Sequence, residues 1–527
     1  MRALTSGVLN LLLTGLALLL AAYGVSLLLN PEIAWSNPEY IVYSVPGSMD
    51  NGLAFTWKDL FKAFDPLTFN DLRPRFLNYL ITVINVKFRL ALYEEFIPSV
   101  NLSLMLLVHL VASPLLLFLS VRNLVKSGSI AFFATCLYLT SVGFLSAGAF
   151  FVQPGKVLIH PMALLLIWAL SSMQKRDQGK FFAEHSPRLV ALVFILNFIA
   201  LSLDDTYIVV SLVACLLFWR LFLPKTLTIQ QLRRATLSGF IFFLPFLLYA
   251  FFVWKVAPEL SEAVGAGRCD YFGFVLGQSS SLTKTPLWPV FRDLTTTAIA
   301  SSFLLRPYPD AMSGVALKLT NFQILFVIAM LAGIAIFAFL GSRKTTASSG
   351  WATNPITAPF AALLCYFIFQ AVLQRFHIQI TGSYYYSSLT GIFVSIFASY
   401  ALASLQPRVS ILGRSALLIM MTIQLSNFID INQRWKNMHM PLIPYSLSTV
   451  RDVYRNVISD DFKTSTLEQL QRMEKIHKDW KAGIRRDLSA EPNWPGSMAW
   501  FLVEMNALSG FVYRDTVRKC QEPKESK

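Results

Sequence analysis

Long apolar runs alternate with short polar segments along this chain. A run of about 17–25 residues with almost no charge is long enough to cross the hydrocarbon core of a bilayer as an α-helix. We expect about eleven such spans, at residues 7–29, 100–121, 129–147, 157–173, 189–203, 207–223, 237–256, 322–341, 358–373, 384–402 and 415–428. The pattern predicts an all-α polytopic membrane protein.

A long polar segment, residues 30–98, separates the first two spans. Its second half contains an amphipathic run from Phe76 to Leu92, with apolar residues on one helical face at positions 77, 80, 81, 84, 88 and 92. A helix with this pattern lies in the membrane interface rather than crossing the bilayer. We therefore expect a first loop that carries interfacial helices.

Two further polar segments cover residues 257–320 and 429–527. In the second, apolar residues follow a helical spacing over 467–484, which indicates a small, mainly helical domain. The predicted division is a transmembrane module over 1–428 and a C-terminal domain or tail over 429–527, which could also bind a protein partner.

Composition agrees with this division, since 55% of the residues are hydrophobic and only 14% are charged. Soluble domains carry about 25% charged residues. The net charge of +15 is explained by basic residues in short loops on the cytoplasmic side rather than by nucleic-acid binding. These basic residues are Arg122, Lys126, Lys175, Arg176, Lys180, Arg188, Lys225, Arg233, Arg234, Arg343, Lys344, Arg408 and Arg414.

This charge pattern predicts a cytoplasmic N-terminus, retained as a first span because its apolar run is too long for a signal peptide. The three large polar segments then lie on the exoplasmic side. Of the five cysteines, three lie in apolar runs and are expected to act as small hydrophobic residues. Cys269 and Cys520 fall in exoplasmic segments, where a disulfide between them is one alternative.

Two short blocks carry a resemblance to a known family. The first is Asp71-Leu72-Arg73-Pro74, followed by the amphipathic run, Pro98, and the stretch Asn101 to His109 that enters the second span. The second is Gly382-Ser383-Tyr384-Tyr385-Tyr386-Ser387-Ser388-Leu389-Thr390-Gly391-Ile392. Together with the layout of residues 1–430, they resemble the GT-C superfamily of membrane glycosyltransferases, in its protein O-mannosyltransferase and TMTC-like branches.

The resemblance implies inverting transfer of a sugar from a polyprenyl-phosphate donor to an acceptor at the exoplasmic face. A carboxylate of the first loop would act as general base, and Asp50 and Asp71 are the candidates, although Asp71 could instead pair with a neighbouring arginine. Cations would stabilise the leaving phosphate. The candidates for this role are Arg73, Arg75, Arg375 and Lys156.

Other candidates for a polar cavity are Asp204, Asp205, His160 and Arg306. Ionisable residues near membrane depth often serve function, but the two aspartates could simply end a span and His160 could be a hydrogen-bonded histidine of the bundle. The aspartate pair also suits a divalent cation, because hard cations prefer carboxylate oxygens. No Cys/His cluster with zinc spacing occurs in the sequence.

The chain departs from the family at the start of the first loop, where related enzymes usually carry an acidic pair. Here the sequence from Tyr43 to Asp50 contains only Asp50. A GT-C-like scaffold or assembly subunit without transfer chemistry is therefore an alternative. A transporter of lipid-linked sugar is a third, although the spans show no inverted symmetry of the kind that transporters carry.

Overall fold

The computed structural model describes residues 2–29, 104–150, 154–177, 179–204, 207–223, 228–263, 356–377 and 388–439, together with positions 77, 80, 81, 84, 88, 332, 333 and 336. Every element in this part of the chain is a helix, as predicted. In chain order these are α1 (Arg2–Leu28), α7 (Leu104–Val125), α8 (Gly128–Leu139), α9 (Val142–Phe150), α10 (Pro154–Arg176), η2 (Phe182–Glu184), α11 (Pro187–Leu203), α12 (Tyr207–Leu217), η3 (Trp219–Leu221), α13 (Ile229–Phe251), η4 (Phe252–Val256), α14 (Ala257–Ala263), α19 (Thr357–His377), α21 (Thr390–Ser404) and α22 (Pro407–His439).

Five of the described helices are long and apolar enough to cross a membrane by themselves. They cover Gly7–Leu28, Leu104–Val125, Val157–Arg176, Ile229–Leu260 and Val409–Ile429, and the bent pair α8–α9 would make a sixth span. Shorter apolar helices occur at α11, α12, α21 and the first part of α19. The chain is therefore a multi-pass integral membrane protein, and most of the predicted span 322–341 lies outside the described residues.

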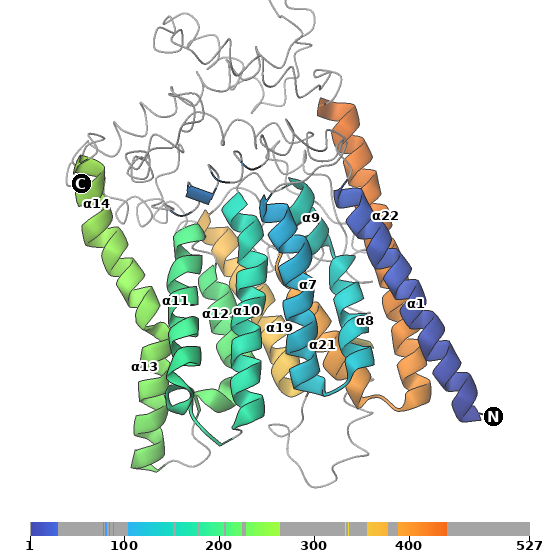
Figure 1. The fold of residues 1–527 in the computed structure, drawn as a ribbon, viewed down its shortest axis with the longest axis horizontal. Helices are drawn as coiled ribbons and strands as arrows, with labels where there is room; N and C mark the ends of the chain where they lie inside the picture. The colour runs from blue at the N-terminus through green and yellow to red at the C-terminus, as the bar shows by residue number, and fades with distance from the viewer. Residues whose placement is uncertain are drawn as a thin grey trace, which may run out of the picture.

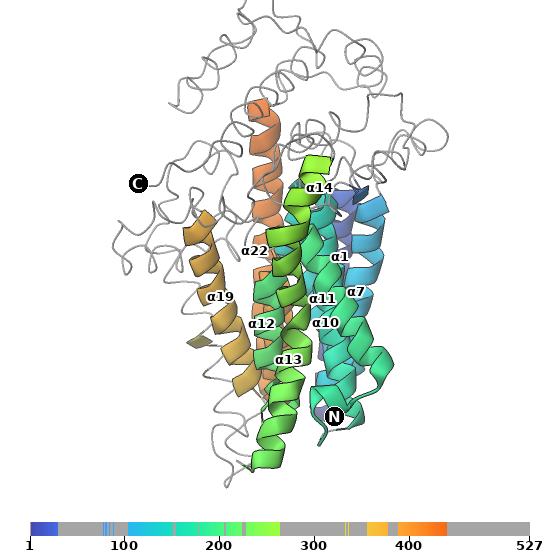
Figure 2. The same ribbon diagram turned by 90° about the vertical axis from the view of Figure 1, so that its left-hand side faces the viewer.

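The helices stand roughly side by side as one bundle (Figures 1 and 2). Neighbours in the bundle include α7 with α10, α7 with α8, α1 with α22, and α12 with α19. Large aromatic side chains are fully buried between them, among them Tyr138, Tyr207 and Tyr366. The outward faces of α1 and α13 carry exposed leucines and phenylalanines, as expected for helices that face lipid.

The loops α7–α8, α10–α11 and α21–α22 lie at the same end of the bundle as the N-terminus (Figure 1). These loops carry many of the basic residues of the positive-inside pattern, so their shared location agrees with that pattern. We call this end of the bundle the N-terminal end. Its assignment to the cytoplasm remains a prediction.

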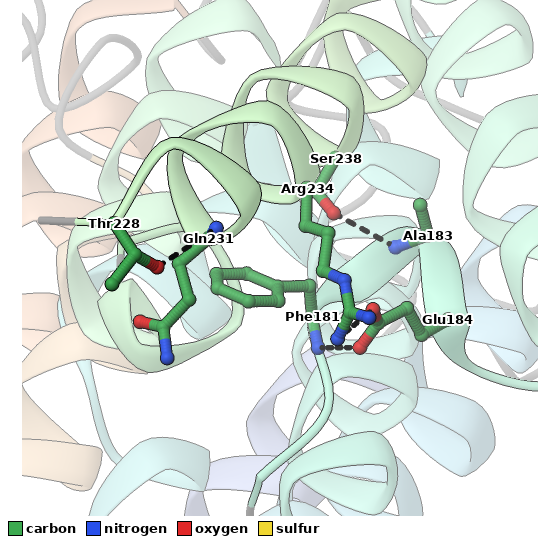
Figure 3. A network of polar contacts seen from close by, with 7 residues as sticks. All are labelled: Phe181, Ala183, Glu184, Thr228, Gln231, Arg234 and Ser238. Atoms are coloured by element: carbon green, nitrogen blue, oxygen red, sulfur yellow. Dashed lines mark hydrogen bonds and ion pairs between the residues drawn. The ribbon is translucent and has the colours of Figure 1, made fainter. Parts of the chain in front are cut away.

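The loop between α10 and α11 is attached to α13 by polar contacts (Figure 3). The Phe181 N–H donates to Glu184 Oε2 at 3.0 Å, and the other oxygen of Glu184 pairs with Arg234 at 3.3 Å. The Ala183 N–H donates to Ser238 Oγ at 3.1 Å. At the start of α13, the Thr228 hydroxyl accepts from the Gln231 N–H, which satisfies one of the free donors of the first helical turn.

The last helix begins earlier than its sequence predicts. The expected span was 415–428, but α22 starts at Pro407 and runs to His439. Proline suits the first turn of a helix, because the missing N–H has no partner there. Arg414, predicted to lie in a cytoplasmic loop, is in fact inside this helix and only 5% exposed; that prediction was wrong.

The described positions of the amphipathic run, residues 77, 80, 81, 84 and 88, are helical, as predicted. Leu77 and Ile81 pack against the core of the bundle, whereas Ile84 is 43% exposed. A stripe four residues apart on a helix points one way. The apolar stripe therefore attaches this part of the first loop to the bundle.

The three cysteines of the apolar runs, Cys136, Cys215 and Cys365, lie in helices as free thiols. Cys269 and Cys520 lie outside the described residues. The C-terminal domain was predicted over residues 429–527, and its part from residue 440 onward also lies outside the described residues.

Candidate functional site

The predicted span 129–147 is not one helix, because the chain bends by 54° between α8 and α9. Thr140 ends α8, and its hydroxyl donates to the Leu137 carbonyl at 3.0 Å. The Ser141 hydroxyl accepts from the Phe144 N–H at 3.3 Å and so caps the start of α9. Side chains of this kind offer the backbone an alternative to continued helix. We call Thr140 and Ser141 the α8–α9 break.

The start of α21 lies directly against this break. A Cβ atom at Gly143 would overlap the Ser388 carbonyl oxygen, and one at Gly391 would overlap Ser141 Oγ. Only glycine permits such a close approach of two backbones. Ser388 and Gly391 belong to the second block of the resemblance, so this block meets the bundle at the break.

Beside the break, three helices bring His109, Tyr138 and His160 together. The Tyr138 hydroxyl and His160 Nδ1 are 2.9 Å apart. The two imidazole rings meet edge to face with centroids 4.9 Å apart. All three side chains are fully buried. We call these residues, together with Ser113, the His–Tyr cluster.

The hydrogen bonds of His109 assign its tautomer. Its Nε2 lies 3.2 Å from the Phe144 carbonyl oxygen, which can only accept, so Nε2–H is the donor. Nδ1 then accepts from the Ser113 hydroxyl at 3.2 Å. The ring also stacks on Phe144 at 4.4 Å between centroids. The backbone carbonyl and the ring of Phe144, near the start of α9, thus both contact His109 on α7.

The first loop lies over this cluster. Ile81 packs against Met105, Ala147 and Val157, at the ends of α7, α9 and α10. His109 follows Met105 by four residues and His160 follows Val157 by three, so the two histidines lie about 6 Å and about 4.5 Å deeper along their helices. Ile81 of the first loop therefore lies about one helical turn above the His–Tyr cluster.

A second polar group lies between α11 and α12. The Ser211 hydroxyl donates to Asn197 Oδ1 at 3.2 Å. Within the described part of the chain, Asn197 Nδ2 is buried without a hydrogen-bond partner. The Tyr207 hydroxyl is also fully buried and has the Ser211 side chain as a polar neighbour.

The structure places the predicted site residues unevenly. His160 belongs to the His–Tyr cluster, which agrees with the hydrogen-bonded role considered from sequence. Asp204 is 1% exposed and ends α11, where its N–H donates to the Ala200 carbonyl at 2.9 Å. Lys156 lies on α10 and Arg375 on α19, but their side chains are outside the described set. The candidates wholly outside the described residues are Asp50, Asp71, Arg73, Arg75, Asp205 and Arg306.

Sequence reasoning missed Tyr138 and Ser113, and it named His109 only as part of the first block. The available signal was a polar side chain within an apolar run, because such side chains in membrane spans usually face the interior of the bundle rather than lipid. No group of three or more His, Cys, Asp or Glu side chains among the described residues could hold a metal ion. The divalent-cation alternative at Asp204 and Asp205 remains a prediction.

The fold and the cluster together define a polytopic, all-helical membrane protein with a buried polar centre beneath its first loop. No family model, curated protein or solved structure matches the chain. Its function is therefore argued from the residues themselves.

Proposed function

We propose that this protein is a membrane glycosyltransferase of GT-C type, which moves a sugar from a polyprenyl-phosphate donor to an acceptor at the exoplasmic face. One observation carries the proposal. The two blocks of the resemblance are more than 270 residues apart, yet both lie near α9. Ile81 packs on the apolar group of Met105, Ala147 and Val157, and Gly391 approaches Ser141, just before α9 begins.

The convergence supports a site at this place because each block contributes to it separately. Asp71, Arg73 and Arg75 precede Ile81 by ten residues or fewer in the sequence. The proposal assigns them to this site on that sequence proximity, since their own positions lie outside the described residues.

In the proposed reaction, a first-loop carboxylate, Asp50 or Asp71, accepts the proton of the acceptor hydroxyl as that oxygen attacks the anomeric carbon. The bond from this carbon to the phosphate oxygen breaks, and the polyprenyl phosphate leaves with the electron pair. Arg73, Arg75, Arg375 and Lys156 are the candidates to stabilise its negative charge, since guanidinium groups bind phosphate oxygens in pairs.

The test is sugar transfer by the purified protein in vesicles that contain a polyprenyl-phosphate-linked sugar. The variants Asp50→Asn, Asp71→Asn and Arg73→Gln are compared with Asp177→Asn, a control at the N-terminal end whose carboxylate pairs only with exposed Lys180 among the described residues. Loss of general base catalysis usually costs about 10²–10⁴-fold in rate. We expect a loss of this size in one of the aspartate variants and none in the control.

A wild-type protein that is folded but transfers no sugar from any polyprenyl-phosphate donor would refute the proposal. It would favour the scaffold alternative, which predicts instead a stoichiometric partner on isolation from native membranes. Full activity in all three variants would refute only the assignment of the site residues, and the proposed activity itself would stand.

A further inference from the structure

A buried arginine lies at the opposite end of the bundle from the His–Tyr cluster. Arg414 on α22 is 5% exposed. Its Nη1 donates to Thr14 Oγ1 on α1 at 3.0 Å, and its guanidinium contacts Ser129 Oγ on α8 at 3.4–3.5 Å. The guanidinium carbon lies 5.4 Å from the centre of the Phe133 ring. Arg414 therefore joins three helices.

The charge of Arg414 is not balanced by these contacts. Its partners are neutral hydroxyl groups, and no carboxylate within the described residues forms an ion pair with it. Its Nε has no hydrogen-bond partner in the same part of the structure. A cation inside a membrane span is costly unless an anion or several acceptors surround it. The site is thus short of negative charge.

The position of the guanidinium makes this shortage larger. Ser129 is the second residue of α8, so Arg414 lies at the N-terminus of that helix. The first N–H groups of a helix have no partner within it, and this end carries partial positive charge. Cations normally lie at the other end of a helix. The Ile130 N–H is capped by Ser127 Oγ at 3.4 Å, which leaves the N–H groups of Gly128 and Ser129. An anion that binds these two N–H groups and the guanidinium would balance both positive charges.

The same place has space and further positive charge. Gly128, the first residue of α8, is exposed, and a Cβ atom there would meet no atom within 4 Å. Lys126 takes a left-handed conformation, with φ 55°, in the turn just before α8. Arg122 is in the last turn of α7. Both side chains are exposed, so they form a basic rim around the open N-terminus of α8.

An apolar side chain that faces outward adjoins the site. Leu18 on α1 is 48% exposed and follows Thr14 by one helical turn on the same face, further from the N-terminal end. The side chain of a helical residue points toward the helix N-terminus, so Arg414 reaches from the apolar part of α22 toward the basic rim. A phospholipid suits this arrangement, because its anionic head group can contact the basic rim while its acyl chains contact the exposed apolar surface.

We propose that Arg414 and the N-terminus of α8 bind the phosphate of an anionic phospholipid from the leaflet at the N-terminal end of the bundle. Arg414, Ser129 and the free N–H groups of α8 bind the phosphate oxygens. The acyl chains lie along the exposed leucines of α1, beginning with Leu18. This site is separate from the proposed transferase site and does not depend on it.

The experiment measures lipid retained by the full-length protein after extraction into nanodiscs of mixed phosphatidylglycerol and phosphatidylcholine, by native mass spectrometry. The variants are Arg414→Gln and Gly128→Leu. The second leaves the arginine in place and fills the open space, where its side chain meets no neighbour. Arg220→Gln is the control, because Arg220 is an exposed arginine that contacts the Trp219 ring. We expect the wild type and the control to retain phosphatidylglycerol about tenfold better than either variant.

Folding of each variant is checked by its elution volume and melting temperature. If Arg414→Gln does not fold, Gly128→Leu alone decides the result. Retention of phosphatidylglycerol at the wild-type level by folded Gly128→Leu would overturn the proposal. It would also be overturned if the wild type retained phosphatidylcholine as well as phosphatidylglycerol. A rise in melting temperature with inorganic phosphate, without retention of phosphatidylglycerol, would assign the site to a free anion and overturn it as well.

Discussion

The hydrogen bond between Tyr138 and His160 can be tested by the substitution Tyr138→Phe. This change removes one oxygen and leaves the ring, which packs on Phe144 at 5.1 Å between centroids. The hydroxyl lies 2.9 Å from His160 Nδ1, and both side chains are completely buried. Because the Ser113 side chain also interacts with this hydroxyl, the contact with His160 is isolated by varying both residues.

The size of the effect follows from the surroundings of the bond. Leaving a buried polar atom without its partner costs about 1–3 kcal/mol in soluble proteins. Between membrane helices the measured coupling is smaller, about 0.6 kcal/mol on average with a maximum of about 1.7 kcal/mol. We therefore expect Tyr138→Phe to lower the free energy of unfolding by about 1 kcal/mol or somewhat more, with a coupling to His160 of about 0.6–1.7 kcal/mol.

The assay is reversible unfolding in mixed micelles for the wild type, Tyr138→Phe, His160→Leu and the double variant. The double-mutant cycle separates the pairwise term from other effects of each change. Tyr23→Phe is the control, because Tyr23 on α1 is 49% exposed and we expect a change below about 0.5 kcal/mol there.

Two results would contradict this reasoning. The first is a Tyr138→Phe variant as stable as the Tyr23→Phe control. The second is strict additivity of the two single changes, which would mean that the side chains of Tyr138 and His160 do not interact in the folded protein.

Three further predictions concern packing, the α10–α11 loop and pH. Gly391→Val should lower the free energy of unfolding by about 1–3 kcal/mol through overpacking, because its Cβ would overlap Ser141. Gly15→Val is the control, since no atom lies within 4 Å of a Cβ there. Equal melting temperatures for the two variants would contradict the close approach of Gly391 to Ser141. Ser238→Ala removes the acceptor of the Ala183 N–H and should lower the free energy of unfolding by about 1–3 kcal/mol. Arg234→Gln should lower it by at most about 1 kcal/mol, because the ion pair with Glu184 is half exposed. A lower denaturant midpoint for Arg234→Gln than for Ser238→Ala would contradict this order. Burial, acting against the opposing effect of Asp177, lowers the pKa of His185. The folded protein then binds this proton less readily than the unfolded chain, so stability is unaffected above the unfolded pKa of about 6.5 and falls as the pH drops through the lower folded pKa. His185→Gln should therefore flatten the loss of melting temperature below about pH 6.5, and an unchanged slope would refute it.

Much of the helical layout could be predicted from sequence, because the length of an apolar run determines whether a helix can cross the bilayer. Predicted and observed helices agree within a few residues for residues 189–203 and α11, and for 358–373 and α19. The starts of α22 and α21 were less predictable. Proline at 407 begins a helix before the apolar run does. Ser388 lies in close contact with Gly143, and among the described residues α21 begins only at Thr390.

The candidate site was less predictable than the helices. His160 was named from sequence, but its partner Tyr138 lies 22 residues away on another helix, and no local pattern relates the two. Arg414 shows the same limit: it was assigned to a basic loop, and its contact with Thr14 joins residues 400 positions apart.

Sequence alone determined that this chain is a polytopic helical membrane protein with an amphipathic first loop, because hydrophobicity and helical period act locally. Only the tertiary structure decided that the chain breaks at Thr140 and Ser141 and that the start of α21 packs on this break. It also decided that Ile81 of the first loop packs beside Ala147 and that Arg414 faces the N-terminus of α8. These features depend on which helices pack together. Packing between distant segments is set by the shapes of whole helix surfaces, which no single stretch of sequence specifies.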